Sequence, residues 1–192
     1  WSINLSIVEN LSAIKTHSAE NLGIATKLAL KSAIAIADGT TKVRAIIGTL
    51  NGFHSDLPEG FLTQVTQESS MSILGETRVI ANDIEDGGLR SEALTEVALM
   101  DFKTTKDSFH KSSRMLSTLE DAQQACLEIA EPEEKLEAIK EMFEVIRSSV
   151  KSESAKGKSE KDILDMLGIT GKLARDIANN PEIKESTAIA IE

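Results

Sequence analysis

Apolar residues recur at steps of three and four along almost the whole chain, which places them on one face of an α-helix. The clearest stripe comprises Ala93, Val97, Met100, Thr104, Ser108, Lys111, Met115, Leu119, Ala122, Cys126 and Ile129. No β-hairpin turn signal is present, and the alternating segments 33–37 and 188–191 suit a helix equally well. The pattern therefore predicts an all-α fold, an elongated helical bundle of five to seven helices.

Glycine, proline and polar clusters divide the pattern into helices. The predicted helices cover residues 1–17, 18–38, 40–53, 58–85, 89–130 and 132–151, with shorter ones after residue 160. Residues 22–37 are apolar on most of their circumference, which predicts a central, largely buried helix. Asp38-Gly39 is interpreted as its C-terminal cap, and Thr40 or Thr41 as the N-cap of the next helix.

The core is expected to be aliphatic, because the chain has one Trp, five Phe and no Tyr. We expect Leu28, Ile34, Ile46 and Ile80 to lie in this core. Truncating such a side chain to Ala costs about 2–5 kcal/mol of stability.

The segment after Gly87-Gly88 forms either one helix or two. Residues Lys103–Arg114 are crowded with Thr and Ser, which favours a bend. If the stripe from Ala93 to Ile129 is one straight helix, it is about 55 Å long. A helix of that length projects from a core of this size, and we therefore expect self-association through the long helices and the Ala188–Glu192 tail. The competing outcome is that a bend at Lys103–Arg114 keeps the chain compact.

Three regions are expected along the chain. Residues 1–151 form the helical bundle, 152–160 a polar linker, and 161–192 short C-terminal helices packed on the bundle. Segment 23–29 is similar to 168–174, and 32–38 to 187–192. Chance similarity between Ala- and Ile-rich helices explains these matches best. The alternative is that the C-terminus begins a second repeat or occupies the equivalent groove of a neighbouring molecule.

The formal net charge of −10 argues against nucleic-acid binding, because such a chain repels phosphate backbones. The acidic residues are densest from Glu131 to Glu144. We interpret this stretch as a solvated helix face, with a surface for a cation or a basic partner as the alternative. The best apolar run, Leu22–Ala37, contains two lysines and is too short and too charged for a transmembrane span.

Two motif fragments fail at positions that their chemistry requires. Segment 83–88 resembles the opening of an EF-hand loop, but Leu94 stands where a bidentate Glu is needed. An acidic helix end followed by glycine caps explains it better. Segment 157–159 resembles the end of a phosphate-binding loop, but Ser152 stands where the first glycine is needed.

The remaining candidates for chemistry are isolated. His17, His54 and His110 lie in different segments without the spacing of a di-iron or zinc site. Asp107 with His110 is the nearest match, and one pair does not make a metal site. Cys126 is the only cysteine, so no intramolecular disulfide forms, and its place on the stripe predicts a buried, unmodified thiol. We therefore predict no catalytic, cofactor-binding or metal-binding residue.

The first residues bear on location. The chain begins at Trp1 rather than Met, which suits a mature protein or numbering that begins inside a longer one. The triplets that begin at Asn4 and Asn10 are glycosylation acceptors if the protein is secreted. We therefore expect an extracellular location.

These patterns favour a non-enzymatic function. We expect a secreted helical-bundle protein that acts through self-association or protein packing, as a homo-oligomer. The alternative is a carrier of lipid or another hydrophobic ligand, because amphipathic helices with an aliphatic interior can enclose an apolar cavity.

Overall fold

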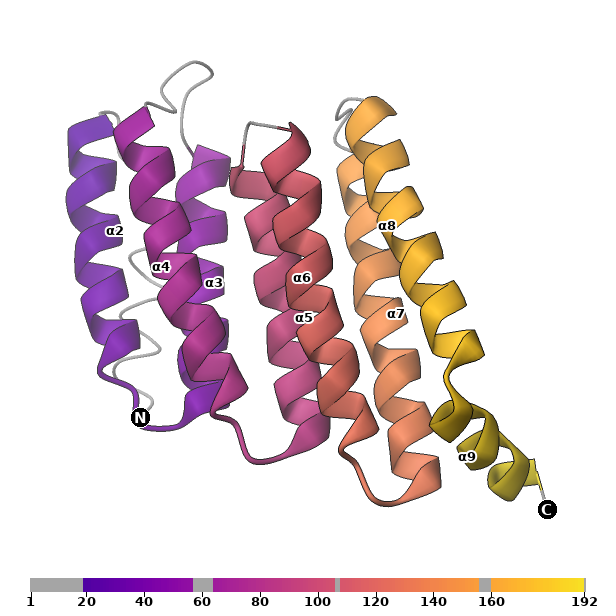
Figure 1. The fold of residues 1–192 in the computed structure, drawn as a ribbon. Helices are drawn as coiled ribbons and strands as arrows, with labels where there is room; N and C mark the ends of the chain where they lie inside the picture. Colours follow the sequence, from indigo (N-terminus) through magenta and orange to yellow (C-terminus); the bar gives the residue numbers. More distant parts are fainter. Residues whose placement is uncertain (1–18, 57–63, 106–107, 156–159, 192) are drawn as a thin grey trace. The chain divides into compact units, whose positions relative to one another are not determined.

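The computed structural model describes residues 19–56, 64–105, 108–155 and 160–191, which form eight α-helices and no strand (Figure 1). The helices are α2 (Ala19–Ile34), α3 (Gly39–Asp56), α4 (Gln64–Asn82), α5 (Gly87–Thr104), α6 (Ser108–Leu127), α7 (Pro132–Ala155), α8 (Glu160–Asn179) and α9 (Pro181–Ile191). The all-α prediction is confirmed. The helix predicted for residues 1–17, with both glycosylation triplets, lies outside the described residues.

The chain divides into two compact units, residues 1–83 and 84–192. In the first unit, α2 packs on α3 and α3 packs on α4. The buried side chains of α3 and α4 include Val43, Ala45, Ile46, Ile47, Leu50, Leu74 and Ala81, whereas Ile80 is half-buried. His54 at the end of α3 lies 3.4 Å from the hydroxyl of Ser70 on α4. The core prediction is therefore correct for Ile46.

The core prediction is wrong for Leu28 and Ile34, which are each 52% exposed. The small side chains of Ala29 and Ala33 occupy the buried face of α2 instead. Alanine lets two helix axes approach closely. Leu28 and Ile34 are each one residue away from that face, about 100° around the helix, and consequently face solvent. A helix that is apolar on most sides thus buries only the side that has a neighbour.

The stripe predicted from Ala93 to Ile129 belongs to two helices, so the single long helix is wrong. The chain leaves α5 at Thr105, whose extended backbone (ψ 124°) ends the helix. The Oγ1 of Thr104 donates to the carbonyl of Met100 inside α5. The two halves of the stripe then pack against each other, because α5 and α6 form an antiparallel hairpin. The Thr- and Ser-rich stretch therefore bends the chain, and the alternative of two helices is correct.

Three connections between helices share one backbone form. Residues 35–38, 83–86 and 128–131 each supply four residues, with Ile at the second position and an acid at the fourth. In each, the first residue donates its N–H to the carbonyl four residues earlier. The carbonyl of the fourth accepts the N–H four residues later, which is the first bond of the next helix.

The acid of each connection begins the next helix. Asp38 accepts the N–H of Thr41 at 2.7 Å, and Asp86 accepts the N–H of Leu89 at 2.8 Å, so both are N-caps. Hydrogen bonds from Thr41 hold the pKa of the Asp38 carboxyl below its ordinary value. The interpretations of Asp38-Gly39 as a C-terminal cap and of Thr40 or Thr41 as the N-cap are therefore wrong. Gly87 likewise opens α5.

The residues after each acid repeat as well. Ile84 follows Ile36 by 48 residues, and Ile129 follows Ile84 by 45. The fourth residue after each acid is basic, and the seventh and eighth are Ala followed by Ile or Leu. These residues are Lys42, Arg90 and Lys135, and the buried pairs Ala45-Ile46, Ala93-Leu94 and Ala138-Ile139. Each connection therefore introduces a helix that buries the same two positions.

In the second unit every helix packs on its neighbours in a regular order. Besides the hairpin of α5 and α6, α5 contacts α7, α6 contacts α8, and α7 contacts α9. Ion pairs join the same part of the fold: Arg90 on α5 pairs with Glu128 in the connection between α6 and α7, and Lys135 on α7 lies 3.9 Å from Glu182 on α9. The C-terminal helices therefore pack on α6 and α7.

The segment predicted as a linker at 152–160 is partly helical. Helix α7 continues to Ala155 and α8 begins at Glu160. Helix α8 has 20 residues, so it is longer than expected for the C-terminal region. The match of 23–29 with 168–174 does not mark equivalent packing, because Leu28 is exposed whereas its counterpart Leu173 is fully buried.

Gly87 tests how closely α5 packs on the end of α6. A Cβ at this position lies 2.8 Å from Cγ1 of Ile129 and 2.9 Å from the carbonyl oxygen of Ala125. Because the backbone carbonyl cannot move cheaply, we expect Gly87→Ala to cost about 1–3 kcal/mol in urea unfolding. The control Gly48→Ala, which meets nothing within 4 Å, should stabilise by about 0.5–1 kcal/mol. Equal stability of Gly87→Ala and the unmodified protein would contradict the close packing.

Candidate binding surface

The described residues hold no group of three or more His, Cys, Asp or Glu side chains that could bind a metal ion. The segment that resembles an EF-hand opening is a helix connection, with Asp86 occupied as an N-cap. Segment 157–159 and His17 lie outside the described residues. His54 contacts Phe53 edge-on at 5.5 Å between ring centres, besides Ser70.

Cys126 is fully buried between α5 and α6, as predicted. Its Sγ donates to the hydroxyl of Ser91 at 3.0 Å, and the carbonyl of Ser91 accepts from Thr95. Burial raises the pKa of the Cys126 thiol, which keeps it protonated at neutral pH. This environment suits a packing residue, because a nucleophilic cysteine needs a lowered pKa.

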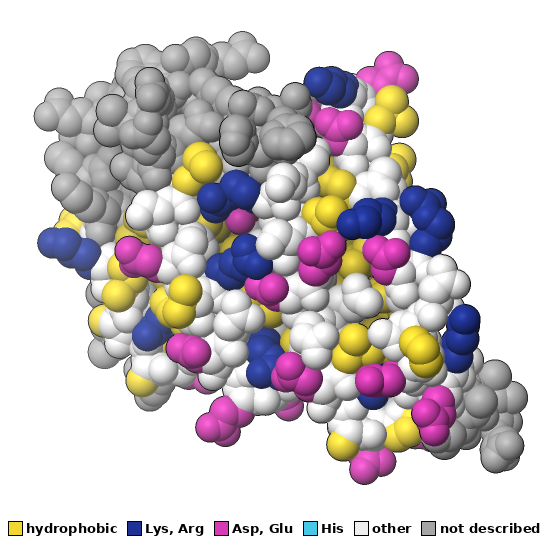
Figure 2. All heavy atoms as spheres, viewed as in Figure 1, with side chains coloured by type: hydrophobic (Ala, Val, Ile, Leu, Met, Phe, Trp, Pro, Cys, Tyr) yellow, Lys and Arg dark blue, Asp and Glu magenta, His cyan; other side chains and the backbone are white. Residues whose placement is uncertain are grey.

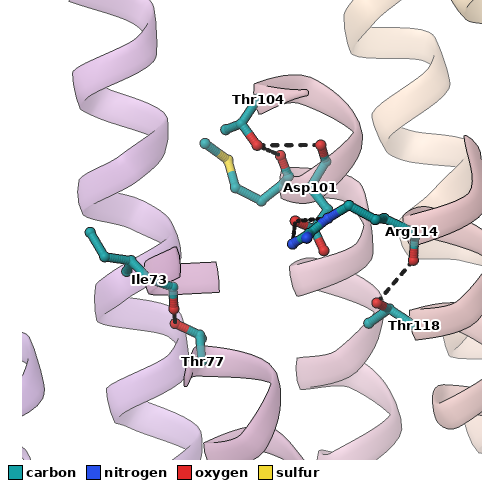
Figure 3. A network of polar contacts seen from close by, with 7 residues as sticks. Ile73, Thr77, Asp101, Thr104, Arg114 and Thr118 are labelled. Atoms are coloured by element: carbon teal, nitrogen blue, oxygen red, sulfur yellow. Dashed lines mark hydrogen bonds and ion pairs between the residues drawn. The ribbon is translucent and has the colours of Figure 1, made fainter. Parts of the chain in front are cut away.

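A buried ion pair joins α5 and α6 near the bend (Figure 3). Asp101, whose side chain is 3% exposed, accepts from Nε of Arg114 at 3.2 Å and from Nη2 at 2.7 Å. The carbonyl of Arg114 accepts the hydroxyl of Thr118. The same view shows Thr77, which donates to the carbonyl of Ile73 within α4. Threonines inside these helices thus satisfy their hydroxyls on their own backbone.

A buried lysine, Lys111, extends this ionic cluster to α8. Nζ of Lys111 lies 2.9 Å from Asp162 on α8 and 4.2 Å from the ring centre of Phe102 on α5. Lysine rarely lies buried without a partner, and the carboxylate and the aromatic face together compensate its burial. Each charge in this cluster is held by a partner within the fold, which indicates a structural role.

The sequence reasoning missed this cluster. Thr104 and Lys111 are polar residues on the otherwise apolar stripe. Their polarity at these positions was the one indication in the sequence of a buried polar cluster. A charged residue on a buried face needs a partner, but the sequence does not identify Asp162 as that partner, because 51 residues separate the two.

A depression of about 320 Å³ lies where α5 and α7 begin. Gly87, Gly88, Ile129 and Ala138 line it together with the carboxylates of Asp86, Glu134, Glu137 and Glu141. Nζ of Lys140 bonds both oxygens of Glu137, which raises the pKa of the lysine amine. The acidic stretch from Glu131 to Glu144 is therefore largely a solvated face, as interpreted, and three of its carboxylates border the depression.

Helix α8 carries two large apolar side chains on its open face. Leu164 is 59% exposed and Leu167 is 50% exposed. Their spacing of three residues places them side by side. Elsewhere, over the described part of the face in Figure 2, acidic and basic side chains are interspersed with apolar ones. The paired leucines of α8 are thus the candidate binding surface in the second unit.

In comparisons with protein-family models, with curated proteins and with solved structures, the chain gives no significant match. Among the described residues, no helix combines the length and the apolar character that crossing a membrane requires.

The ion pair of Asp101 and Arg114 can be tested by removing the cation. Arg114→Met leaves a buried carboxylate without this partner, and we expect a loss of about 2–4 kcal/mol in urea unfolding at pH 7. A third of the Arg114 side chain is in solvent, which lowers the expectation for a fully buried pair. The control Arg147→Met breaks an exposed pair with Glu144 and should cost less than about 1 kcal/mol. Equal losses in the two variants would contradict a structural role for the buried pair.

The burial of Cys126 predicts slow reaction with a thiol reagent at pH 7.4. We expect labelling only after denaturation, because the folded state hides the sulfur and raises its pKa. A Ser152→Cys variant supplies a matched exposed thiol on α7 that should label within minutes. Rapid labelling of Cys126 in the folded protein, or a dimer bridged by it, would show that the thiol is accessible.

Proposed function

We propose that this protein is a non-enzymatic helical-repeat protein that acts by packing against other protein chains, including further copies of itself. The observation that carries the proposal is the repeated connection at 35–38, 83–86 and 128–131. A unit that recurs after 45 to 48 residues and contains two helices is the form of an α-solenoid repeat.

The packing order in the second unit supports this proposal. In a solenoid, each repeat buries its apolar faces on the repeats before and after it. The contacts of α5 with α7, α6 with α8, and α7 with α9 follow this rule. Solenoids present extended surfaces to their partners, and their terminal faces need a cover.

The character of the polar residues also favours association over catalysis. Asp101, Arg114, Lys111 and Asp162 are used within the fold, and the thiol of Cys126 is buried with a raised pKa. An enzyme needs titratable groups that converge on an accessible cleft. We therefore favour a binding role, and the expected extracellular location remains part of the proposal.

The carrier alternative receives less support. The depression at the start of α5 and α7 is lined by four carboxylates, a lining that does not favour a lipid tail. Mass spectrometry of an organic extract of the natively purified protein would revive that alternative if it detected one lipid per chain.

Association is measured directly by sedimentation velocity of the whole chain between about 1 and 100 μM. We expect the mean mass to rise above 20.7 kDa as the concentration increases, because exposed apolar helix faces are covered on association. A control at high urea should give the monomer mass. A mass of one chain at all concentrations would contradict self-association.

A further inference from the structure

Helix α8 has two apolar faces. One is buried against the second unit and carries Met166, Ile169, Leu173 and Ile177. The other carries Leu164 and Leu167 at its N-terminal half, and small residues further along. These small residues are Gly168, Gly171, Ala174 and Ala178. A helix with a second apolar face presents a surface for another helix.

The packing order indicates what kind of element fits this face. Helices α5, α6 and α7 are each covered by the helix two positions later in the sequence. By the same order, the helix that would cover α8 comes two positions after it. The open face of α8 is therefore the place where the packing of α6 on α8 would continue. The spacing of Leu164, Leu167, Gly171, Ala174 and Ala178 alternates steps of three and four, which is the seam of a helix pair.

We propose that a second copy of this chain covers the open face of α8 with its own α8, antiparallel and related by a two-fold axis near Gly171. The inference deepens the proposed function and rests on it. An isologous contact requires a self-complementary surface. The antiparallel arrangement places the leucines of one helix opposite the alanines of the other, where space is available.

The charges of α8 favour the same arrangement. The N-terminal half holds three acids and one lysine, whereas the C-terminal half holds two basic residues and one acid. These residues are Glu160, Asp162, Asp165 and Lys161, and then Lys172, Arg175 and Asp176. An antiparallel pair brings the acidic half of one helix to the basic half of the other, and a parallel pair does not. Lys172 also lies 3.4 Å from Glu120 of α6, an exposed contact that costs little to rearrange.

The glycines permit a close approach. A Cβ at Gly168 meets no atom within 4 Å, and at Gly171 the nearest is a guanidinium nitrogen of Arg175 at 3.8 Å. The fold of one chain therefore does not require glycine at either position. Once the exposed Arg175 side chain moves aside, the two glycines let a partner helix lie close to the backbone at the proposed axis.

The first test combines Leu164→Glu with Leu167→Glu in the whole chain. Leu164 is 59% exposed and Leu167 is 50% exposed. The double variant should therefore keep the helical circular dichroism and the thermal midpoint of a folded monomer. We expect its dimer dissociation constant to rise at least 100-fold in sedimentation velocity. The control Val79→Glu, at a side chain that is 61% exposed on α4, should associate as the unmodified protein does.

The second test maps the axis. Gly171→Cys should be joined efficiently to its copy by a short bismaleimide, and Ser152→Cys should not. The buried Cys126 should not compete. If the unmodified chain associates but the double variant associates equally well, or Gly171→Cys is not joined, the α8 interface is wrong and the proposed function stands. If the unmodified chain is a strict monomer, the α8 interface and the self-association in the proposed function are both wrong.

Discussion

The capped connection between successive helices is the constraint on which the rest of the fold depends. Its acid accepts N–H groups that a helix start leaves without a partner, as Asp38 does for Thr41 and Asp86 for Leu89. Of the isoleucines two residues before the acids, Ile36 and Ile84 are buried, whereas Ile129 is half-buried. Because the acid fixes where the helix begins, it also fixes which residues face inward seven and eight positions later.

Burial of apolar side chains contributes more to the stability of this arrangement than its exposed ion pairs do. The ion pairs between successive repeats, Arg90 with Glu128 and Lys135 with Glu182, each have a half-exposed or more exposed carboxylate. Such pairs contribute little energy, but they favour one register. The ion pairs of Asp101 with Arg114 and of Lys111 with Asp162 act differently. Removing one partner would leave a buried charge alone in the core, which is costly. These two ion pairs favour the bend between α5 and α6 over other arrangements of the same stripe.

The sequence predicted burial well wherever a residue lay on a stripe with a matching neighbour. Ile46 and Cys126 are buried for that reason. It failed for Leu28 and Ile34, because periodicity shows that a helix is apolar but not which side has a neighbour. It left the bend at Thr105 open, since helical spacing continues across a break. The repeat was missed because an acid and a basic residue four positions later mark it. A search for the spacing of apolar residues does not detect these polar positions.

The proposed binding role rests on how the polar groups are used and on which apolar side chains remain exposed. Every charge in the α5, α6 and α8 cluster has a partner inside the fold, whereas Leu164 and Leu167 face solvent. Hydrogen exchange followed by mass spectrometry, at about 1 and 100 μM protein, tests this account most directly. It predicts that peptides from α8 gain protection at the higher concentration while those from α5 and α6 do not. Unchanged exchange in α8, or a gain confined to other helices, would contradict it.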